Sequence, residues 1–428
     1  MTGRRRPSTP RTLTLFTSTA VAGALLTTGC GVVPGGSADA GAPVTVMTWA
    51  PRGAADDADA LSKSGVTAMA SAYARWVDSE GGIDGRELKV VTCDEKDTTV
   101  GAEKCARQAV EQDVAAVVGS YSRHGRSFLA PLEAAGIPYI GGYGASDEEF
   151  SSFVSFPVNG GQSSLLAGNG KQLAAGCHRV ALVRPDSIAG DAMAPLLDTS
   201  LAEARRGAAT DVVAPESATS YDEQARQALA AADDDGCVTA VLDDRTQTFF
   251  DSFRRLEPED GGVRISSVLG SVGQPLIDST GGANSPFEGA YVTGWYPDSG
   301  DARWDPMREV LRAHAFGDNT IDPADTGVQT AWIAYTVLAQ AVRALDGADA
   351  TASRVMAVLN RGLSVDTGGL TPTLRWRYQD MLGSSAYPRI VNGEVTFQVV
   401  REGRLVAQKQ GFVDVTETLS NARSAAGG

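Results

Sequence analysis

Short uninterrupted apolar runs alternate with segments of helical periodicity along most of this 428-residue chain. The apolar runs are residues 44–49, 88–92, 114–118, 138–140, 180–183, 212–214, 238–242 and 265–269. Helical periodicity marks, among others, residues 68–77, 102–112, 127–135 and 192–205. Apolar strands separated by helices indicate parallel sheets that helices cover on both faces. Because eight such units exceed what one doubly wound sheet usually holds, we predict an α/β fold with two lobes.

The C-terminal third has a different pattern. An alanine-rich stretch predicts a long helix over residues 328–345, and a second helix is expected over 352–360. Two turn signals then follow, Asn392-Gly393 between apolar residues and Glu402-Gly403 before another short apolar run. They predict antiparallel strands at the end of the chain.

A chain that finishes this way is expected to cross between two lobes more than once. We predict lobe 1 from residues 44–155 and 289–368, and lobe 2 from 156–288 and 369–416. Residues 417–428 are small and polar and are expected to form a disordered tail.

The N-terminus is typical of an export signal. Four arginines precede an uncharged stretch, residues 13–26, that is shorter than the roughly 20 residues a spanning helix needs. Small residues then lead to Cys30. This end resembles the lipobox of bacterial lipoproteins, although Thr27 stands where that pattern prefers leucine. The resemblance implies that residues 1–29 are removed and that Cys30 is acylated.

An ordinary secretory signal with an incidental cysteine is the alternative to this interpretation, and either one places the mature protein outside the cytoplasm. Residues 30–43 are small and rich in glycine and proline, so we expect a flexible tether.

The charge excludes one class of partner. Loss of residues 1–29 removes four arginines and no acid, which changes the net charge from −15 to −19. A body this acidic repels phosphate backbones, so no nucleic-acid partner is expected. The cysteine, histidine and aspartate spacings fit neither zinc nor calcium, and no metal or other cofactor is predicted.

Four cysteines remain after Cys30, and an even number in an oxidising compartment suggests two disulfides. Four cysteines allow three pairings. Cys93 ends a strand-like run and Cys105 lies in the next helical segment, while Cys177 and Cys237 each precede an apolar run. Neighbouring parallel strands would bring the last two together, so we favour Cys93–Cys105 and Cys177–Cys237. Four buried free thiols are the alternative.

One segment of the chain, GGIDGR at residues 81–86, is followed by a strand and then Asp94. This pattern resembles type I periplasmic binding proteins, most closely the leucine/isoleucine/valine-binding family that serves ABC importers. The resemblance continues, in the family's order, through residues 115–119, 136–140, 153–157 with Gln162, and 177–183. It implies two Rossmann-like lobes with parallel sheets, joined by a three-crossing hinge, and a ligand held in the cleft between them.

The resemblance also implies ligand contacts in lobe 1. A hydroxyl-rich loop of the family corresponds here to Ser122 and Arg123, where arginine replaces serine. The Arg123 guanidinium would pair with an anionic group, or it points to solvent while Ser122 makes the contact. Gly144, Ala145 and Ser146 correspond to the next contact loop. Ser146 is also a typical helix N-cap, and the two roles are compatible.

Lobe 2 departs further from the family pattern. Arg245 stands where an aromatic residue often contacts ligand, and Gly270 where an acid receives the ammonium group of an amino acid. An unpaired ammonium in a closed cleft is costly, so Gly270 argues against an α-amino acid, unless Asp243 or Asp244 substitutes. Aromatic residues that could form an apolar wall, or simply pack in the core or rim, are Trp49, Tyr121, Tyr143, Trp295 and Tyr296.

These observations predict a monomeric, lipid-anchored solute-binding protein that delivers a small amino-acid-like or carboxylate ligand to an ABC permease. Alternatives are a ligand-sensing receptor domain of the same fold, a degenerate relative without a ligand, and a hydrolytic enzyme. The chain has no Gly-x-Ser-x-Gly elbow, P-loop or His-Glu-x-x-His motif. Of its three histidines only His124 falls near the predicted cleft, so we expect no enzymatic activity.

Overall fold

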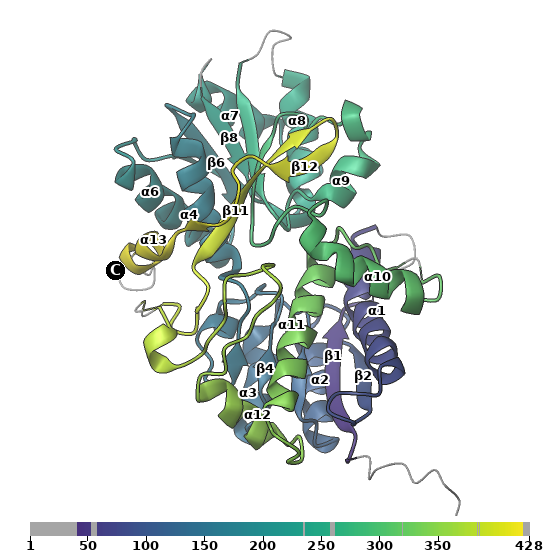
Figure 1. Ribbon diagram of the computed structural model, residues 1–428. Coiled ribbons are helices and arrows are strands. Elements are labelled where there is room, and N and C mark those ends of the chain that lie inside the picture. Colours follow the sequence, from purple (N-terminus) through teal and green to yellow (C-terminus); the bar gives the residue numbers. More distant parts are fainter. Residues whose placement is uncertain are drawn as a thin grey trace, which may run out of the picture. The chain divides into compact units, whose positions relative to one another are not determined.

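The computed structural model describes residues 41–52, 58–233, 236–256, 262–318, 320–382, 384 and 386–422 (Figure 1). The predicted signal peptide, Cys30 and most of the predicted tether lie outside the described residues. Two separate sheets organise the described chain, each with parallel strands alternating with helices. The predicted α/β class is therefore confirmed.

The first sheet is parallel throughout, with the strand order β2-β1-β3-β4-β5. Its strands are β1 (Val44–Ala50), β2 (Leu88–Asp94), β3 (Ala116–Val118), β4 (Tyr139–Ile140) and β5 (Ser155–Phe156). The helices between them are α1 (Ala58–Ser79), α2 (Thr99–Glu111) and α3 (Gly125–Ala135).

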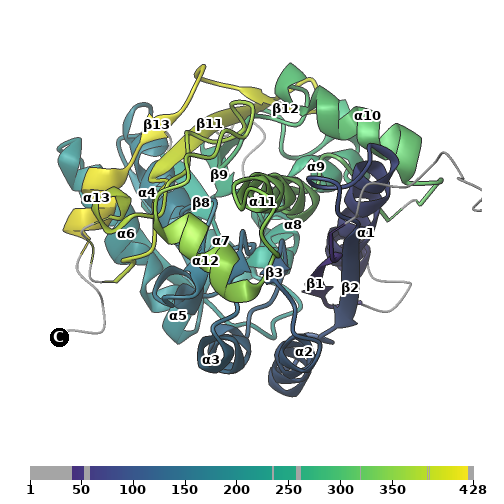
Figure 2. The same ribbon diagram turned by 60° about the horizontal axis from the view of Figure 1, so that its bottom comes forward.

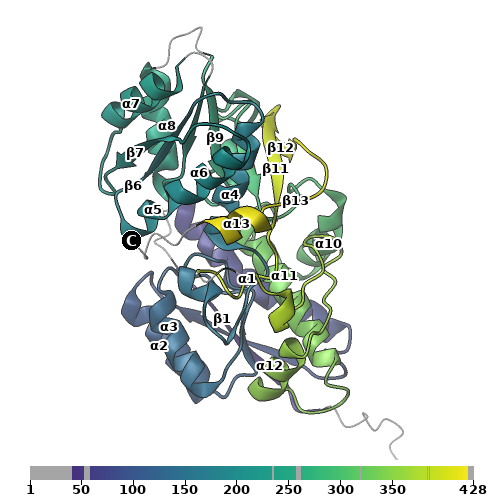
Figure 3. The same cartoon turned by 90° about the vertical axis from the view of Figure 1, so that its left-hand side faces the viewer.

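Helices cover both faces of this sheet, which is why its strands are apolar on both sides. Val46 and Val118 pack in the core cluster with α1 and with α11 (Thr326–Arg343), the long predicted helix. Helix α11 contacts β4 and also β3, beside which it lies in Figure 2. Met47 and Trp49 belong to a separate cluster with α2 and α3, which lie side by side (Figure 3).

The second sheet has the order β12-β11-β10-β9-β8-β6-β7, with β13 paired to β11. Its parallel strands are β6 (Val180–Pro185), β7 (Thr210–Ala214), β8 (Cys237–Ala240), β9 (Arg264–Val268) and β10 (Tyr291–Gly294). Its antiparallel strands are β11 (Glu394–Arg401), β12 (Arg404–Ala407) and β13 (Val413–Asp414).

Helices of varied length accompany these strands. They are α4 (Gly161–Ala174), α5 (Ile188–Asp191), α6 (Met193–Glu203), α7 (Asp222–Ala232), α8 (Thr246–Leu256), α9 (Gln274–Ser279), α10 (Asp305–His314), α12 (Ala352–Asn360) and α13 (Thr416–Asn421). Short 3₁₀ turns include η1 (Asp147–Phe150) and η2 (Asp243–Arg245).

Three expectations about the chain's organisation need correction. Lobe 1 was predicted to resume at residue 289. The strand that follows, β10, pairs with β9 and β11 and so belongs to the second sheet. Asn392-Gly393 makes no hairpin, since residues 390 and 391 belong to no strand; the Asn392 side-chain amide donates to Val158 O at 3.2 Å. The predicted tail begins with helix α13, which buries Leu419.

Both favoured disulfides are confirmed. Cys93–Cys105 joins the end of β2 to α2, with the Cα atoms 5.7 Å apart. Cys177–Cys237 joins the chain before β6 to the first residue of β8, with the Cα atoms 5.8 Å apart. These strands are parallel neighbours, and Cys237 lies opposite Val180.

Candidate functional site

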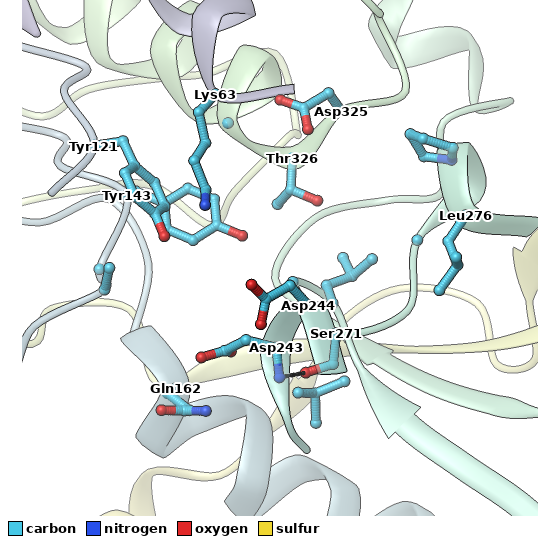
Figure 4. A pocket seen from close by; sticks show the side chains of 18 of the residues that line it. Lys63, Tyr121, Tyr143, Gln162, Asp243, Asp244, Ser271, Leu276, Asp325 and Thr326 are labelled. Carbon is cyan, nitrogen blue, oxygen red and sulfur yellow. Dashed lines mark hydrogen bonds between the residues drawn. The ribbon is translucent and has the colours of Figure 1, made fainter. Parts of the chain in front are cut away.

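A cavity of about 500 Å³ lies where loops that follow the strands of both sheets meet (Figure 4). The first sheet supplies residues that follow β3 and β4, and the second sheet supplies residues that follow β8, β9 and β10. Parallel strands bring their carboxyl ends to one edge of a sheet, and ligands bind there in open α/β folds. Residues of α1, α8 and α9 and of the N-terminal parts of α4 and α11 complete the lining.

Three aromatic side chains form one wall of the cavity. The ring centroids of Tyr121 and Tyr143 are 5.0 Å apart, and those of Tyr143 and Trp295 are 5.3 Å apart with an interplanar angle of 85°. The Trp295 indole donates to Gly161 O at 2.9 Å, which fixes that ring. Burial raises the pKa of both tyrosines, so their phenols stay protonated and can donate hydrogen bonds at neutral pH.

Two basic side chains lie beside this wall. Lys63 extends from α1 so that its Nζ is 5.4 Å from the ring centroid of Tyr121 (Figure 4). Arg123 forms an ion pair with Asp97 at 3.7 Å. Burial opposes the charge of Arg123, but Tyr121, Asp97 and Asp243 raise the pKa of the guanidinium above its usual value. Arg123 therefore carries a fixed positive charge at the cavity.

Acidic residues line the cavity from both sheets. Asp243 and Asp244 belong to η2, and the Asp243 N–H donates to Ser271 Oγ at 3.2 Å (Figure 4). Asp325 is the N-cap of α11, and its carboxylate accepts from Val328 N–H at 2.9 Å. The lining thus combines cationic, anionic and aromatic groups, which suits a small polar ligand with a flat apolar part.

Four of the predicted ligand-binding residues, Arg123, Gly144, Ala145 and Gly270, line the cavity. Gly270 has a φ of +96°, and a Cβ there would lie 3.1 Å from Tyr143 Oη. This backbone conformation disfavours any residue but glycine. No carboxylate can therefore replace Gly270 without strain, and the acids beside it are Asp243 and Asp244.

The other three predicted residues do not line the cavity. Ser122 is buried and donates to Glu95 Oε2 at 3.0 Å. Ser146 is the N-cap of η1, and its N–H donates to Glu149 Oε1 at 3.2 Å. Arg245 is exposed and donates to Ala218 O at 3.4 Å. Each of these side chains already has a partner within the protein.

Several polar residues of the lining were not predicted to contact a ligand, namely Lys63, Gln162, Gln247, Ser271, Ser279, Asp325 and Thr326. Asp325-Thr326 precedes the predicted long helix, and an N-cap signal there points to a helix end that can face a ligand. Nothing in the sequence around Lys63 marks it. Two candidate aromatics also lie elsewhere, Trp49 in the core beside Phe128 and Tyr139, and Tyr296 under α11, bonded to Thr330.

Among the described residues, no three or more histidine, cysteine, aspartate or glutamate side chains are grouped so as to hold a metal ion. Within that same part of the chain, no helix has the length and apolar character to cross a membrane.

Comparison with known proteins agrees with this architecture. The family model described as "Periplasmic binding protein" matches residues 56–387. No curated protein matches significantly.

Solved structures share the fold. A substrate-binding periplasmic protein from Ralstonia solanacearum is 17% identical with a TM-score of 0.68, covering 85% of this chain and 100% of the other. A solute-binding protein of an ABC transporter from R. palustris, in complex with 4-hydroxybenzoate, is 14% identical with a TM-score of 0.69, covering 87% and 97%. One from Rhodopseudomonas palustris HaA2, in complex with p-hydroxybenzoic acid, is 15% identical with a TM-score of 0.71, covering 89% and 100%. The family match over most of the chain, on a fold whose two α/β sheets share a cavity, shows that this protein belongs to the periplasmic binding protein family.

Proposed function

We propose that this protein is the extracytoplasmic solute-binding component of an ABC importer. The observation that carries the proposal is the cavity, because loops from both sheets supply its charged and aromatic residues. A ligand that contacts both sheets stabilises their closed arrangement over an open one, and only such differential affinity shifts a hinge equilibrium. The closed form would then dock on a membrane permease and release the ligand.

The lining favours a small carboxylate with a flat apolar body. Lys63 and Arg123 supply positive charge next to the aromatic wall, and the tyrosine phenols supply hydrogen bonds. The two relatives from Rhodopseudomonas bind hydroxybenzoates, which carry this combination of groups. An amino-acid-like ligand would instead place its ammonium group against Asp243 or Asp244.

A thermal-shift screen of the chain from residue 31 tests this function. The screen covers aromatic acids, dicarboxylates, amides and amino acids, each at a concentration far above a micromolar dissociation constant. A ligand at a hundred times its dissociation constant adds about 2.7 kcal/mol to the free energy of unfolding. Stabilisation by at least one acid supports the proposal, and no stabilisation by any compound would refute it.

We further propose that Cys30 anchors the exported protein to the outer face of the cell membrane through a thioether-linked lipid. Replacing Cys30 with serine removes the thiol that is acylated, so the protein should move from the membrane fraction to the medium or periplasm. Metabolic labelling with a clickable palmitate should mark the wild type and not the variant. Equal labelling of both proteins would contradict the anchor.

A further inference from the structure

Two loops of the first sheet form one side of the cavity. Residues 119–124 follow β3 and residues 141–146 follow β4, and together they contribute Tyr121, Arg123, Tyr143, Gly144 and Ala145 to the lining. Two buried glutamates lie beneath these loops, Glu95 with 0% and Glu149 with 2% of its surface exposed. Neither glutamate lines the cavity.

Glu149 holds the second loop by its backbone. Its Oε2 accepts from Gly144 N–H at 3.2 Å, and its Oε1 accepts from Ser146 N–H at 3.2 Å and from Ser146 Oγ at 3.4 Å. One carboxylate thus binds donors on both sides of Ala145. A buried N–H that loses its acceptor costs about 1–3 kcal/mol, so the loop conformation depends on this carboxylate.

Gly142 supports the same interpretation. A Cβ at this position would lie 2.1 Å from Glu149 Oε2 and 2.2 Å from Tyr139 Cε1. The absence of a side chain at residue 142 is what lets the Glu149 carboxylate reach the loop.

Glu95 holds the first loop through a hydroxyl. Ser122 lies between the two lining residues of this loop, and its Oγ donates to Glu95 Oε2 at 3.0 Å and accepts from His124 N–H at 3.1 Å. Asp97 lies beside the same loop, 3.6 Å from His124 Nε2 and 3.7 Å from the Arg123 guanidinium. The loops are also joined to each other, because Tyr143 N–H donates to Ser120 O at 3.0 Å.

We propose that Glu95 and Glu149 are positioning residues. They bind the two loops on the side that faces away from the cavity, and they thereby fix the residues that line it. The proposal rests on the proposed function only in giving the cavity a ligand. It assigns a role to Ser122 and Ser146 as well: both hydroxyls point to a glutamate and hold a loop.

The hydrogen bonds that hold the two loops should change in strength when these glutamates gain or lose a proton. Burial raises the pKa of Glu149 to about 8, although the donors of its own loop lower it. An ionised carboxylate can accept hydrogen bonds on both of its oxygens, whereas the proton of a carboxylic acid occupies one of the lone pairs that would accept them. The hydrogen bonds to Gly144 and Ser146 should therefore strengthen as the pH rises through about 8.

Other titratable groups face the two glutamates. Tyr139 on β4 lies close to both, and burial together with the two carboxylates raises its pKa, so it stays protonated. On α3, which packs against η1, Arg126 pairs with Glu148, and Glu133 accepts from Ser152.

Around Glu95, burial raises the pKa to about 7, the Ser122 hydrogen bond and His124 lower it, and Asp97 and Asp94 raise it.

The test uses ligand-free, ¹⁵N-labelled protein. The amides of Gly144 and Ser146 should show a chemical-shift titration with a midpoint near pH 8. The Ser122 amide should show one near pH 7 in His124→Gln protein, where no imidazole titrates beside it. Glu149→Gln places an NH₂ group against the loop donors, so it should abolish the step near pH 8. It should also speed hydrogen exchange of these two amides about 10-fold or more, which corresponds to the loss of about 1.4 kcal/mol.

Glu288→Gln is the matched control. The Glu288 carboxylate accepts from Glu402 N–H at 2.8 Å and Gly403 N–H at 3.0 Å at the turn between β11 and β12, so it also holds backbone amides but does not line the cavity. This variant should leave exchange at Gly144 and Ser146 unchanged. Unchanged exchange there in Glu149→Gln would overturn the proposal.

Hydrogen exchange in the wild-type protein tests the proposal even where Glu149→Gln does not fold. Amides of Gly144 and Ser146 that exchange there as fast as unprotected loop amides would also overturn the proposal. A ligand screen without hits would count against the proposed function and leave both of these results as they are.

Discussion

Replacing Cys177 and Cys237 together with alanine should lower the free energy of unfolding by about 4 kcal/mol. The bridge closes a loop across a sequence separation of 60 residues, and removing it restores that freedom to the unfolded chain. Both cysteines are buried, with 0% and 1% of their surfaces exposed, so alanine leaves a small cavity in addition. Equilibrium denaturation in guanidinium chloride measures the difference.

The bridge between Cys93 and Cys105 is the internal comparison. Its sequence separation is 12 residues, for which the same chain-entropy model gives about 3 kcal/mol. The loss should therefore be smaller for this pair than for Cys177–Cys237. Equal stability of the wild type and the Cys177–Cys237 variant under oxidising conditions would show that the bridge does not form in the protein.

Replacing Arg123 with alanine should weaken binding of a carboxylate ligand by a factor of about 10 to 150. This range corresponds to the roughly 1.5–3 kcal/mol that a hydrogen bond to a charged group contributes. Arg123 lines the cavity and is held there by Asp97, so its charge is in place before a ligand arrives. Isothermal titration calorimetry with the best acid from the screen measures the change.

Arg126→Ala is the matched control for Arg123→Ala. Arg126 follows in the same stretch of chain, carries the same charge, pairs with Glu148 at 3.4 Å and does not line the cavity. Its removal should change the affinity by less than a factor of about two, because exposed ion pairs contribute little. If both variants lost the same affinity, Arg123 would act only through the net charge of the protein.

Most of the order of strands and helices could be predicted from the sequence, because uninterrupted apolar runs mark the buried strands and helical periodicity marks the helices. β5 and β10 were not predicted because Ser155–Phe156 and Tyr291–Gly294 contain polar residues and form no uninterrupted apolar run. Pairing with neighbouring strands makes them part of the sheets. Asn392-Gly393 has a hairpin signature, but the Asn392 side chain bonds to a distant carbonyl. Local chemistry cannot show such tertiary partners.

The candidate site was predictable in its location and less so in its chemistry. The loops with Arg123, Gly144 and Gly270 face the cavity because they follow strands, which the sequence does show. Ser122 and Ser146 lie on the predicted loops with their side chains bonded to buried glutamates. The direction of a side chain on a loop depends on its tertiary contacts, such as these buried glutamates. The hydrophobic pattern of the sequence does not reveal such contacts.

A tryptophan placed inside the cavity tests the central claim most directly. Ala145→Trp fills space between the two sheets, whereas Ala208→Trp adds the same group on an exposed loop. Calorimetry with the best acid from the screen should show one site in the wild type and in Ala208→Trp, and no measurable binding in Ala145→Trp. Binding of equal strength by a folded Ala145→Trp protein would contradict a ligand site in this cavity.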